Sequence, residues 1–371
     1  MTILGTRPEI IRLSLVIKQL DEFCDHVLVH TGQNYDASLS RVFFDQLEVR
    51  PPEVNMGVRA QSFSGQIGQI LEQSEKLFLE HRPDRLLILG DTNSGMSAIV
   101  ARRLGIPVYH MEAGNRCYDD RVPEEVNRRI IDHSSSVLMP YTNRSRENLL
   151  AEGFATNRVY VTGNPIKEVM DHFDPQIADS TVLDQFGLTK GKFFLVTIHR
   201  AENVDAETRL RTLIESFAQL SKDYGYPVIC SFHPRTKSKV DGFKLNINLE
   251  GLQFVEPLGF FDFIQLEKSA FCILSDSGTV QEEACILGVP NVTIRDVTER
   301  PETLECGSNI LSGADPEWIS RAVEMVSSRT GQWIPPCEYV ARGVADTVCR
   351  ILLSYRIPDL AEKSWQSRPI D

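Results

Sequence analysis

Two short segments each place a carboxylate soon after an apolar run, and these carboxylates are the residues best suited to chemistry. Asp91 follows the run 86–89, and Glu112 follows the run 106–109. Each run predicts a buried parallel strand, so both carboxylates are expected at the carboxyl edge of one sheet. Open α/β sheets bind ligands and carry out chemistry at that edge.

A third acidic segment adds Glu124 and Glu125 at a predicted helix start, followed by Asn127 and Arg128. Carboxylates that crowd one site can have their pKa values pushed apart into acid and base roles. The three segments therefore predict proton transfer. The alternative is that each residue is an ordinary loop or helix cap, a role that Asp and Asn often take.

The segment 271–284 predicts a strand, a turn of small residues and a helix. Backbone N–H groups of Ser277, Gly278 and Thr279 would point outward at the helix N-terminus, where the helix dipole favours a diphosphate. Glu283 lies one turn into this helix, where a carboxylate can accept from ribose hydroxyls. The alternative is again a helix cap.

Basic residues also stand at predicted strand ends. His199 and Arg200 end the first strand of the second half, His233 follows the next strand, and Arg7 lies in the first half. Basic groups at such places in an acidic protein indicate an anion pocket. A lone His is more often a structural hydrogen-bonding residue, but the adjacent Arg200 favours a functional role for His199.

The elements that must hold these residues alternate between strand and helix, which is typical of doubly wound α/β domains. Thr6 and Glu9 have capping-box spacing for a first helix. The predicted strands of the first half are 2–4, 26–30, 85–89, 107–111 and 136–139. Those of the second half are 193–197, 227–231, 252–255, 271–274 and 291–294.

A chain of 371 residues exceeds the usual size of one core, so two domains are expected. We predict two Rossmann-like domains with a cleft between them. Residues 1–163 carry the carboxylates and end at a Gly-Asn-Pro cluster, residues 164–340 form the second domain, and residues 341–371 form a helix crossing back plus a loose tail. GxGxxG and Walker A patterns are absent, so dinucleotide binding and NTP hydrolysis lack their signatures.

The composition excludes several functional classes. A net charge of −12 disfavours a nucleic-acid partner. No apolar run has the length of a membrane span, and the N-terminus does not resemble a signal peptide. The eight cysteines are scattered without a CxxC, which predicts reduced thiols, no metal site and a cytoplasmic location.

Seven segments together resemble the non-hydrolysing UDP-N-acetylglucosamine 2-epimerases. In chain order they are GTRPE (5–9), GDT (90–92), EAG (112–114), PEEVNR (123–128), HRAEN (199–203), SDSGTVQEE (275–283) and RDVTERPE (295–302). Any one of them is a weak signal. Seven in this order across nearly the whole chain are specific.

The resemblance implies a fold like that of the GT-B glycosyltransferases, with UDP held mainly by the second domain. It implies inversion at C2 of a UDP-2-acetamido sugar through elimination and re-addition of UDP, with no metal or other cofactor. The resemblance assigns acid–base catalysis to Asp91, Glu112 and Glu124 and places His199 near the diphosphate and reacting centre. It assigns UDP and substrate binding to Arg7, Asn127, Arg128, Arg200, His233, Ser277, Gly278, Thr279 and Glu283. A homodimer is also implied.

The segments 12–14 and 199–205 look closer to the branch that forms UDP-N-acetyl-L-fucosamine from UDP-2-acetamido-2,6-dideoxy-L-talose for capsule or O-antigen. Asn34, Asp36 and Ala201 depart from the commonest family pattern, which argues against activation by a second sugar nucleotide. The alternatives are a UDP-N-acetylglucosamine to UDP-N-acetylmannosamine epimerase, a GT-B glycosyltransferase, a hydrolysing epimerase and a regulator that binds UDP-sugar without chemistry.

Overall fold

The computed structural model describes residues 1–32, 37–60, 62–328 and 331–354. The chain divides into two compact units. The first unit is Met1–Val169 together with the segment that begins at Ala341, and the second unit is Met170–Val340. Asn34, Asp36 and the predicted tail from Pro358 lie outside the described residues.

The first unit is built on a six-stranded sheet in the order β3-β2-β1-β4-β5-β6. All neighbouring strands are parallel. This is the Rossmann order, in which the chain direction across the sheet reverses between β1 and β4. The strands are β1 (Thr2–Leu4), β2 (Leu28–His30), β3 (Val54–Asn55), β4 (Leu86–Leu89), β5 (Val108–Met111) and β6 (Val137–Met139).

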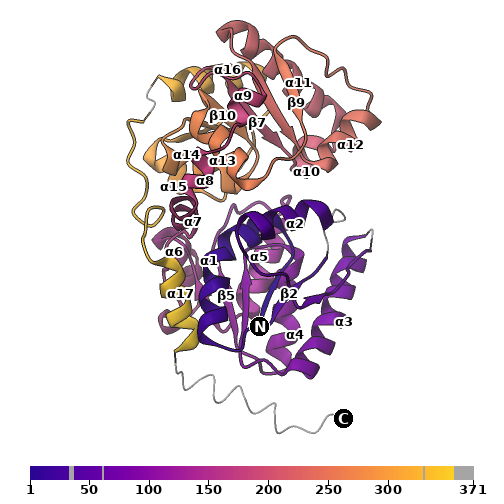
Figure 1. The fold of residues 1–371 in the computed structure, drawn as a ribbon, viewed down its shortest axis with the longest axis vertical. Coiled ribbons are helices and arrows are strands. Elements are labelled where there is room, and N and C mark those ends of the chain that lie inside the picture. Colours follow the sequence, from indigo (N-terminus) through magenta and orange to yellow (C-terminus); the bar gives the residue numbers. More distant parts are fainter. Residues whose placement is uncertain (33–36, 61, 329–330, 355–371) are drawn as a thin grey trace. The chain divides into compact units, whose positions relative to one another are not determined.

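Helices flank this sheet (Figure 1). They are α1 (Arg7–Phe23), α2 (Ala37–Gln46), α3 (Phe63–His81), the 3₁₀ helix η1 (Asn93–Met96), α4 (Ser97–Arg103), α5 (Pro123–Ser134), α6 (Asn143–Ala151), the 3₁₀ helix η2 (Thr156–Arg158) and α17 (Val344–Leu353). Helix α7 (Ile166–His172) joins the two units.

Helix α17 packs against α1, although the two lie at opposite ends of the sequence (Figure 1). The thiol of Cys349 donates to the Val16 carbonyl at 3.8 Å, and the backbone N–H of Ala345 donates to Glu168 at 3.0 Å. Val344, Val348 and Leu352 lie on the buried side of α17. An apolar stripe at this spacing is what a helix needs to cover a core.

The second unit repeats the same plan. Its six-stranded parallel sheet has the order β12-β11-β10-β7-β8-β9, and the reversal lies between β7 and β10. The strands are β7 (Phe194–Ile198), β8 (Val228–Phe232), β9 (Leu252–Val255), β10 (Cys272–Ser275), β11 (Asn291–Thr293) and β12 (Asn309–Leu311).

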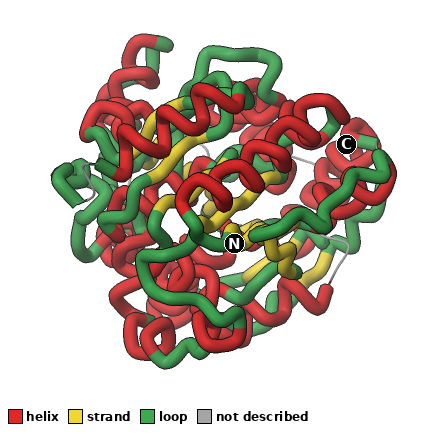
Figure 2. The backbone as a smooth tube through the Cα atoms, turned by 90° about the horizontal axis from the view of Figure 1, so that it is seen from above, coloured by secondary structure: helices red, strands yellow, loops and turns green. Residues whose placement is uncertain are grey.

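Figure 2 shows the helices of the chain in red and its strands in yellow. Helices flank the sheet of the second unit as well (Figure 1). They are α8 (Asp174–Ala178), α9 (Val182–Gln185), α10 (Ala201–Val204), α11 (Glu207–Tyr224), α12 (Pro234–Gly242), α13 (Phe260–Ser269), α14 (Gly278–Leu287), α15 (Pro301–Cys306) and α16 (Pro316–Ser327). Buried side chains of β7, β8, β10 and β11 pack with α11 and α16 to form its main core.

The predicted α/β class with two Rossmann-like sheets is confirmed. Strands β3 and β12 were not predicted, because both are short edge strands that are only partly buried and so lack the continuous apolar run of a central parallel strand. The predicted capping box is wrong in detail. Thr6 is the N-cap of α1, but its side chain makes no cap hydrogen bond and instead donates to Glu9. Within the described residues, no helix is long and apolar enough to cross a membrane.

Candidate active site

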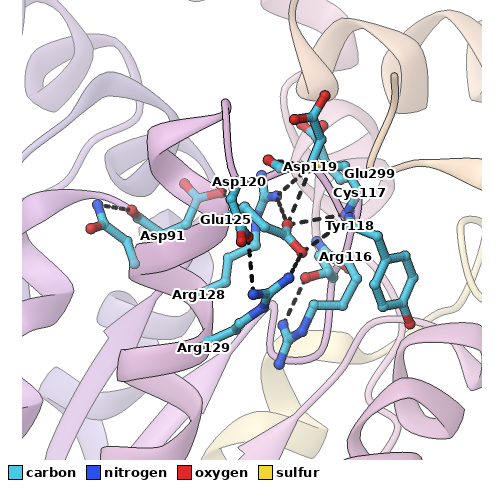
Figure 3. Close-up of polar contacts among 12 residues, drawn as sticks. Asp91, Arg116, Cys117, Tyr118, Asp119, Asp120, Glu125, Arg128, Arg129 and Glu299 are labelled. Carbon is cyan, nitrogen blue, oxygen red and sulfur yellow. Dashed lines mark hydrogen bonds and ion pairs between the residues drawn. The ribbon is translucent and has the colours of Figure 1, made fainter. Parts of the chain in front are cut away.

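Asp91 follows β4 and is held by two residues of α5. Arg128 approaches the Asp91 carboxylate through Nε at 2.8 Å and Nη2 at 2.7 Å. The side-chain amide of Asn127 donates to the Asp91 backbone carbonyl at 3.0 Å. Asn127 and Arg128, which were both predicted to bind substrate, therefore contact Asp91. Arg128 holds the Asp91 carboxylate in one orientation (Figure 3).

Arg128 also ties this site to Glu125, which is fully buried (Figure 3). Its Nη1 lies 2.8 Å from the Glu125 carboxylate, which accepts from the backbone N–H groups of Cys117 and Tyr118. Burial alone would raise the pKa of Glu125, but these donors lower it overall. Glu124, the predicted catalytic neighbour, is half-buried in the first turn of α5.

Glu112 follows β5 and adopts a left-handed backbone conformation with φ of 65°. Such a conformation is uncommon for a residue with a side chain. Its carboxylate lies 3.4 Å from Nη1 of Arg12 and accepts from Asn115 at 3.3 Å. Arg12 is only 1% exposed, so this contact is a buried ion pair. In the sequence, Arg12 is a cation on the apolar side of the first helix, and no local pattern indicates its contact with Glu112.

Helix α1 carries two more groups to the same edge. Glu9 is fully buried and accepts from Gly5 N–H at 3.1 Å, from the hydroxyls of Thr6 and Thr92, and from Ser94. Burial, partly offset by these hydrogen bonds, raises the pKa of Glu9 to about 7. Sequence reasoning assigned it only a capping role.

Arg7, the first residue of α1, lies over the ring of Phe43 with 5.7 Å between the guanidinium carbon and the ring centre. Burial lowers its pKa. The guanidinium is half-buried, so a cation is held at the end of β1 beside the reversal point of the sheet.

In the second unit, His199 follows β7 and is held by Asp276, which follows β10. The His199 Nδ1 lies 3.1 Å from the Asp276 carboxylate, which also accepts from the backbone N–H groups of His199 and Arg200 and from Asn203. Burial by itself would raise the pKa of Asp276, but the His199 ring and these donors outweigh it and lower the pKa to about 2. Asp276 belongs to the segment 275–283, but nothing in the local sequence distinguishes it from a turn residue.

The start of α14 matches the predicted phosphate-binding segment. Ser277 is the N-cap, and its hydroxyl lies 3.0 Å from that of Thr279 without capping the helix. At Gly278 an added methyl would meet Glu299 at 2.5 Å. Glu299 pairs with Arg200 at 3.5 Å, so the predicted anion-binding residues Arg200 and Gly278 both adjoin one carboxylate.

Two further predicted residues lie in the second unit. His233 is the N-cap of α12, and its ring centre is 6.2 Å from that of His199. Glu283 is buried in α14. Burial and the adjacent Glu283 raise the pKa of Glu267, on α13, well above its ordinary value. The pair therefore tends to share a proton.

Each unit thus places its predicted residues after the carboxyl ends of its strands, on the strands that flank the reversal point and on the next strand, β5 or β8. Open α/β sheets bind ligands at this edge. The first unit presents oriented carboxylates suited to proton transfer, and the second presents cations and a helix N-terminus suited to a diphosphate. In the described parts of the chain, no group of three or more His, Cys, Asp or Glu residues is arranged to hold a metal ion.

Comparison with known proteins identifies the family. The family model described as UDP-N-acetylglucosamine 2-epimerase matches residues 18–352. The chain belongs to this family. The predicted enzyme class is thereby confirmed.

Relatives within the 2-epimerase family differ in the sugar they are named for. The UDP-N-acetylglucosamine 2-epimerase of Methanocaldococcus jannaschii is 40% identical over 342 residues, which cover 90% of this chain and 93% of that protein. The UDP-2,3-diacetamido-2,3-dideoxy-D-glucuronate 2-epimerase of Pseudomonas aeruginosa is 35% identical, covering 90% and 93%.

The solved M. jannaschii epimerase, in complex with UDP-GlcNAc and UDP, matches 95% of this chain and 98% of its own, with a TM-score of 0.90 and 39% identity. The Neisseria meningitidis epimerase bound to UDP-GlcNAc covers 95% and 98%, with a TM-score of 0.85 and 26% identity. The GT-B-like fold is therefore shown, whereas the roles of individual site residues stay predictions.

Proposed function

We propose that this protein inverts C2 of a UDP-2-acetamido sugar by eliminating UDP and adding it back. The observation that carries the proposal is a pair of carboxylates, Asp91 and Glu112, at the ends of adjacent strands β4 and β5, each contacted by a buried arginine. In a 2-epimerase, two carboxylates held in this way suit removal and return of a proton.

Elimination solves the chemical problem of a barely acidic C2 hydrogen. The electron pair of the C2–H bond forms a C1–C2 double bond while the C1–O bond breaks and its electron pair leaves with UDP. A carboxylate takes the proton. Re-addition of UDP to C1, with a proton delivered to the other face of C2, gives the epimer, and UDP is not consumed. We assign Asp91, Glu112 and Glu124 to these proton transfers.

The second unit supports the departing UDP. Its negative charge calls for fixed donors, because groups that are already oriented stabilise developing charge without reorganisation. His199, held by Asp276, supplies a positioned ring, and the first turn of α14 supplies the N–H groups of Gly278 and Thr279 together with the Ser277 hydroxyl. The Ser277 N–H, which was also predicted to face the diphosphate, donates instead to the Ser275 hydroxyl at 3.0 Å. Arg7, Arg200 and His233 add positive or donating groups, and Glu283 serves the ribose.

We propose UDP-2-acetamido-2,6-dideoxy-L-talose as the substrate, with UDP-N-acetyl-L-fucosamine as product for capsule or O-antigen. The segments 12–14 and 199–205 support this branch. The relatives named for UDP-N-acetylglucosamine, at 40% identity, favour a second candidate, the formation of UDP-N-acetylmannosamine. We also propose a cytoplasmic homodimer, which light scattering of the purified protein and cell fractionation test.

The deciding experiment incubates the protein with each of the two sugar nucleotides in D₂O and follows C2 by NMR. We expect deuterium at C2 and an epimer from the deoxy sugar. Exchange with UDP-N-acetylglucosamine alone would overturn the substrate and keep the reaction. Release of free sugar would indicate a hydrolysing epimerase. The absence of exchange with either substrate would overturn the reaction and return attention to a glycosyltransferase.

A further inference from the structure

A buried histidine, His110 in β5, lies between the segments that carry Asp91 and Glu112. It is 1% exposed. Its Nε2 is 2.8 Å from the carbonyl of Gly90, the residue before Asp91. Its Nδ1 is 2.8 Å from the carboxylate of Asp132 on α5.

Asp132 extends this contact to the Glu112 segment. Its second carboxylate oxygen accepts from the backbone N–H of Gly114 at 3.2 Å and from Arg116 at 2.8 Å. Arg116 in turn pairs with Glu152 at 2.7 Å. Burial by itself would raise the pKa of Asp132, but His110 and Arg116 lower it below its ordinary value. Asp132 is therefore an acceptor on both oxygens.

These partners fix the position of the His110 ring. A backbone carbonyl and a carboxylate only accept hydrogen bonds. Both ring nitrogens face such an acceptor, so the ring is held between Gly90 and Asp132. The buried charge of Arg116 is balanced by Asp132 and Glu152, as buried charges require.

We infer that His110 is a positioning residue that sets the separation and orientation of the two proton-transferring carboxylates. The inference rests on the proposed function, since it takes Asp91 and Glu112 to be the proton-transferring residues. Gly90, Glu112 and Gly114 all have left-handed backbones, with φ of 74°, 65° and 80°. Such turns keep one geometry only when their backbone groups have fixed partners. His110 contacts the Gly90 carbonyl of the first segment, and Asp132 accepts from the Gly114 N–H of the second.

The test uses His110→Gln, which keeps one donor, and Asp132→Asn, which keeps shape and removes charge. The same unit offers a matched control pair at the opposite end of the sheet. There the His26 ring lies 2.6 Å from Asp21 and 2.8 Å from the hydroxyl of Thr2. His26→Gln and Asp21→Asn thus remove equivalent contacts far along the strands from the carboxyl edge.

We expect kcat to fall about 10-fold to 10²-fold in both His110→Gln and Asp132→Asn, because small misplacements of reacting groups have effects of that size. KM is expected to stay within about twofold, as is usual when only transition-state geometry is disturbed. The control variants are expected to keep kcat, and thermal unfolding shows how much stability each variant loses. Equal losses of kcat in both pairs, or none in the His110 pair, would overturn the inference.

Nitrogen-15 NMR of glycine-labelled protein supplies a readout that does not need activity. We expect the backbone signals of Gly90 and Gly114 to shift in His110→Gln and in Asp132→Asn, and to keep their wild-type positions in His26→Gln and Asp21→Asn. Unchanged Gly90 and Gly114 signals in either folded variant of the His110 pair would contradict the inference. Wild-type protein without C2 exchange would instead overturn the proposed function, so the two failures are distinguishable.

Discussion

At the scale of single residues, the predicted catalytic carboxylates of the first unit are held by contacts with neighbouring side chains. The Asp91 carboxylate contacts both Nε and Nη2 of Arg128, and its backbone carbonyl accepts a hydrogen bond from the side-chain amide of Asn127. A carboxylate held this firmly is suited to take a proton from one direction. Its replacement by an amide of the same shape removes the basic oxygen and the negative charge that pairs with Arg128.

For Asp91→Asn we therefore expect turnover to fall roughly 10²-fold to 10⁴-fold, the usual scale for an acid–base group. UDP affinity is expected to stay within about twofold, because the residues that we propose to bind UDP lie mainly in the second unit. Steady-state kinetics and calorimetric titration with UDP check this. Asp25→Asn, at an exposed position, is the control. Full activity of Asp91→Asn would mean that another group transfers the proton.

Glu9 gives a pH prediction with a definite sign. Its pKa is about 7 in the folded protein, against an ordinary value of 4.5. Between these values the folded state binds more protons than the unfolded state, so the free energy of unfolding falls as pH rises. Glu9→Gln has no carboxyl at this position, so its free energy of unfolding lacks this decrease. Relative to the wild type, we expect the free energy of unfolding of the variant to rise by up to about 3 kcal/mol between pH 4.5 and pH 8.

Urea unfolding of both proteins across this range measures the effect. Glu22→Gln, an exposed residue of the same helix, is expected to show no such trend. A difference between Glu9→Gln and wild type that stays constant with pH would mean that Glu9 is ionised in the folded protein throughout.

At the scale of elements, tight turns at strand ends bring the catalytic segments against neighbouring helices. Gly114 has a φ of 80°, and an added Cβ would meet the carbonyl of Ser145 and lie 2.7 Å from Leu149 Cγ on α6. A side chain there would force the β5–α5 segment away from α6. The site thus depends on glycine for both conformation and close approach.

We expect Gly114→Ala to destabilise the protein by roughly 2–4 kcal/mol, combining left-handed strain with overpacking. Gly153→Ala is the matched control, because Gly153 has a φ of 91° but nothing within 4 Å of an added Cβ. It is expected to show the strain alone, at about 1 kcal/mol. Thermal unfolding measures both, and equal losses would rule out the contact with α6.

At the scale of the whole molecule, two sheets of the same strand order carry the two sets of predicted residues. The carboxylates predicted to transfer protons lie in the first unit, and most of the groups predicted to bind UDP lie in the second. Because a ligand that binds only the folded state stabilises it, UDP at 100 times its Kd is expected to add about 2.7 kcal/mol. Hydrogen exchange is expected to slow mainly around residues 199–203 and 277–283.

Two glycine variants sharpen this measurement. Gly278→Ala is expected to lose the stabilisation by UDP, because its methyl would meet Glu299 at 2.5 Å. Gly242→Ala, with nothing within 4 Å of the added Cβ, is expected to keep it. Protection confined to the first unit would contradict the assignment of UDP to the second.

Sequence alone determined the local elements and the chemistry-bearing segments. Apolar runs such as 86–89 and 272–274 marked strands, because buried parallel strands are continuously apolar. Turn residues such as Gly90 and Gly278 marked where those strands end. The order of seven motifs indicated the family. These signals are local, so they survive without knowledge of the fold.

Only the tertiary structure determined which side chains contact one another. Arg12 reaches Glu112 across 100 positions of sequence, and Asp276 reaches the backbone of His199 across 77. The position of each pair beside a reversal point in its sheet depends on strand order, which no local pattern encodes. Side chains such as Glu9, His110 and Asp132 look unremarkable in sequence. Their roles arise from burial and from partners that only the folded chain brings together, because charges and hydrogen bonds act through space and not along the chain.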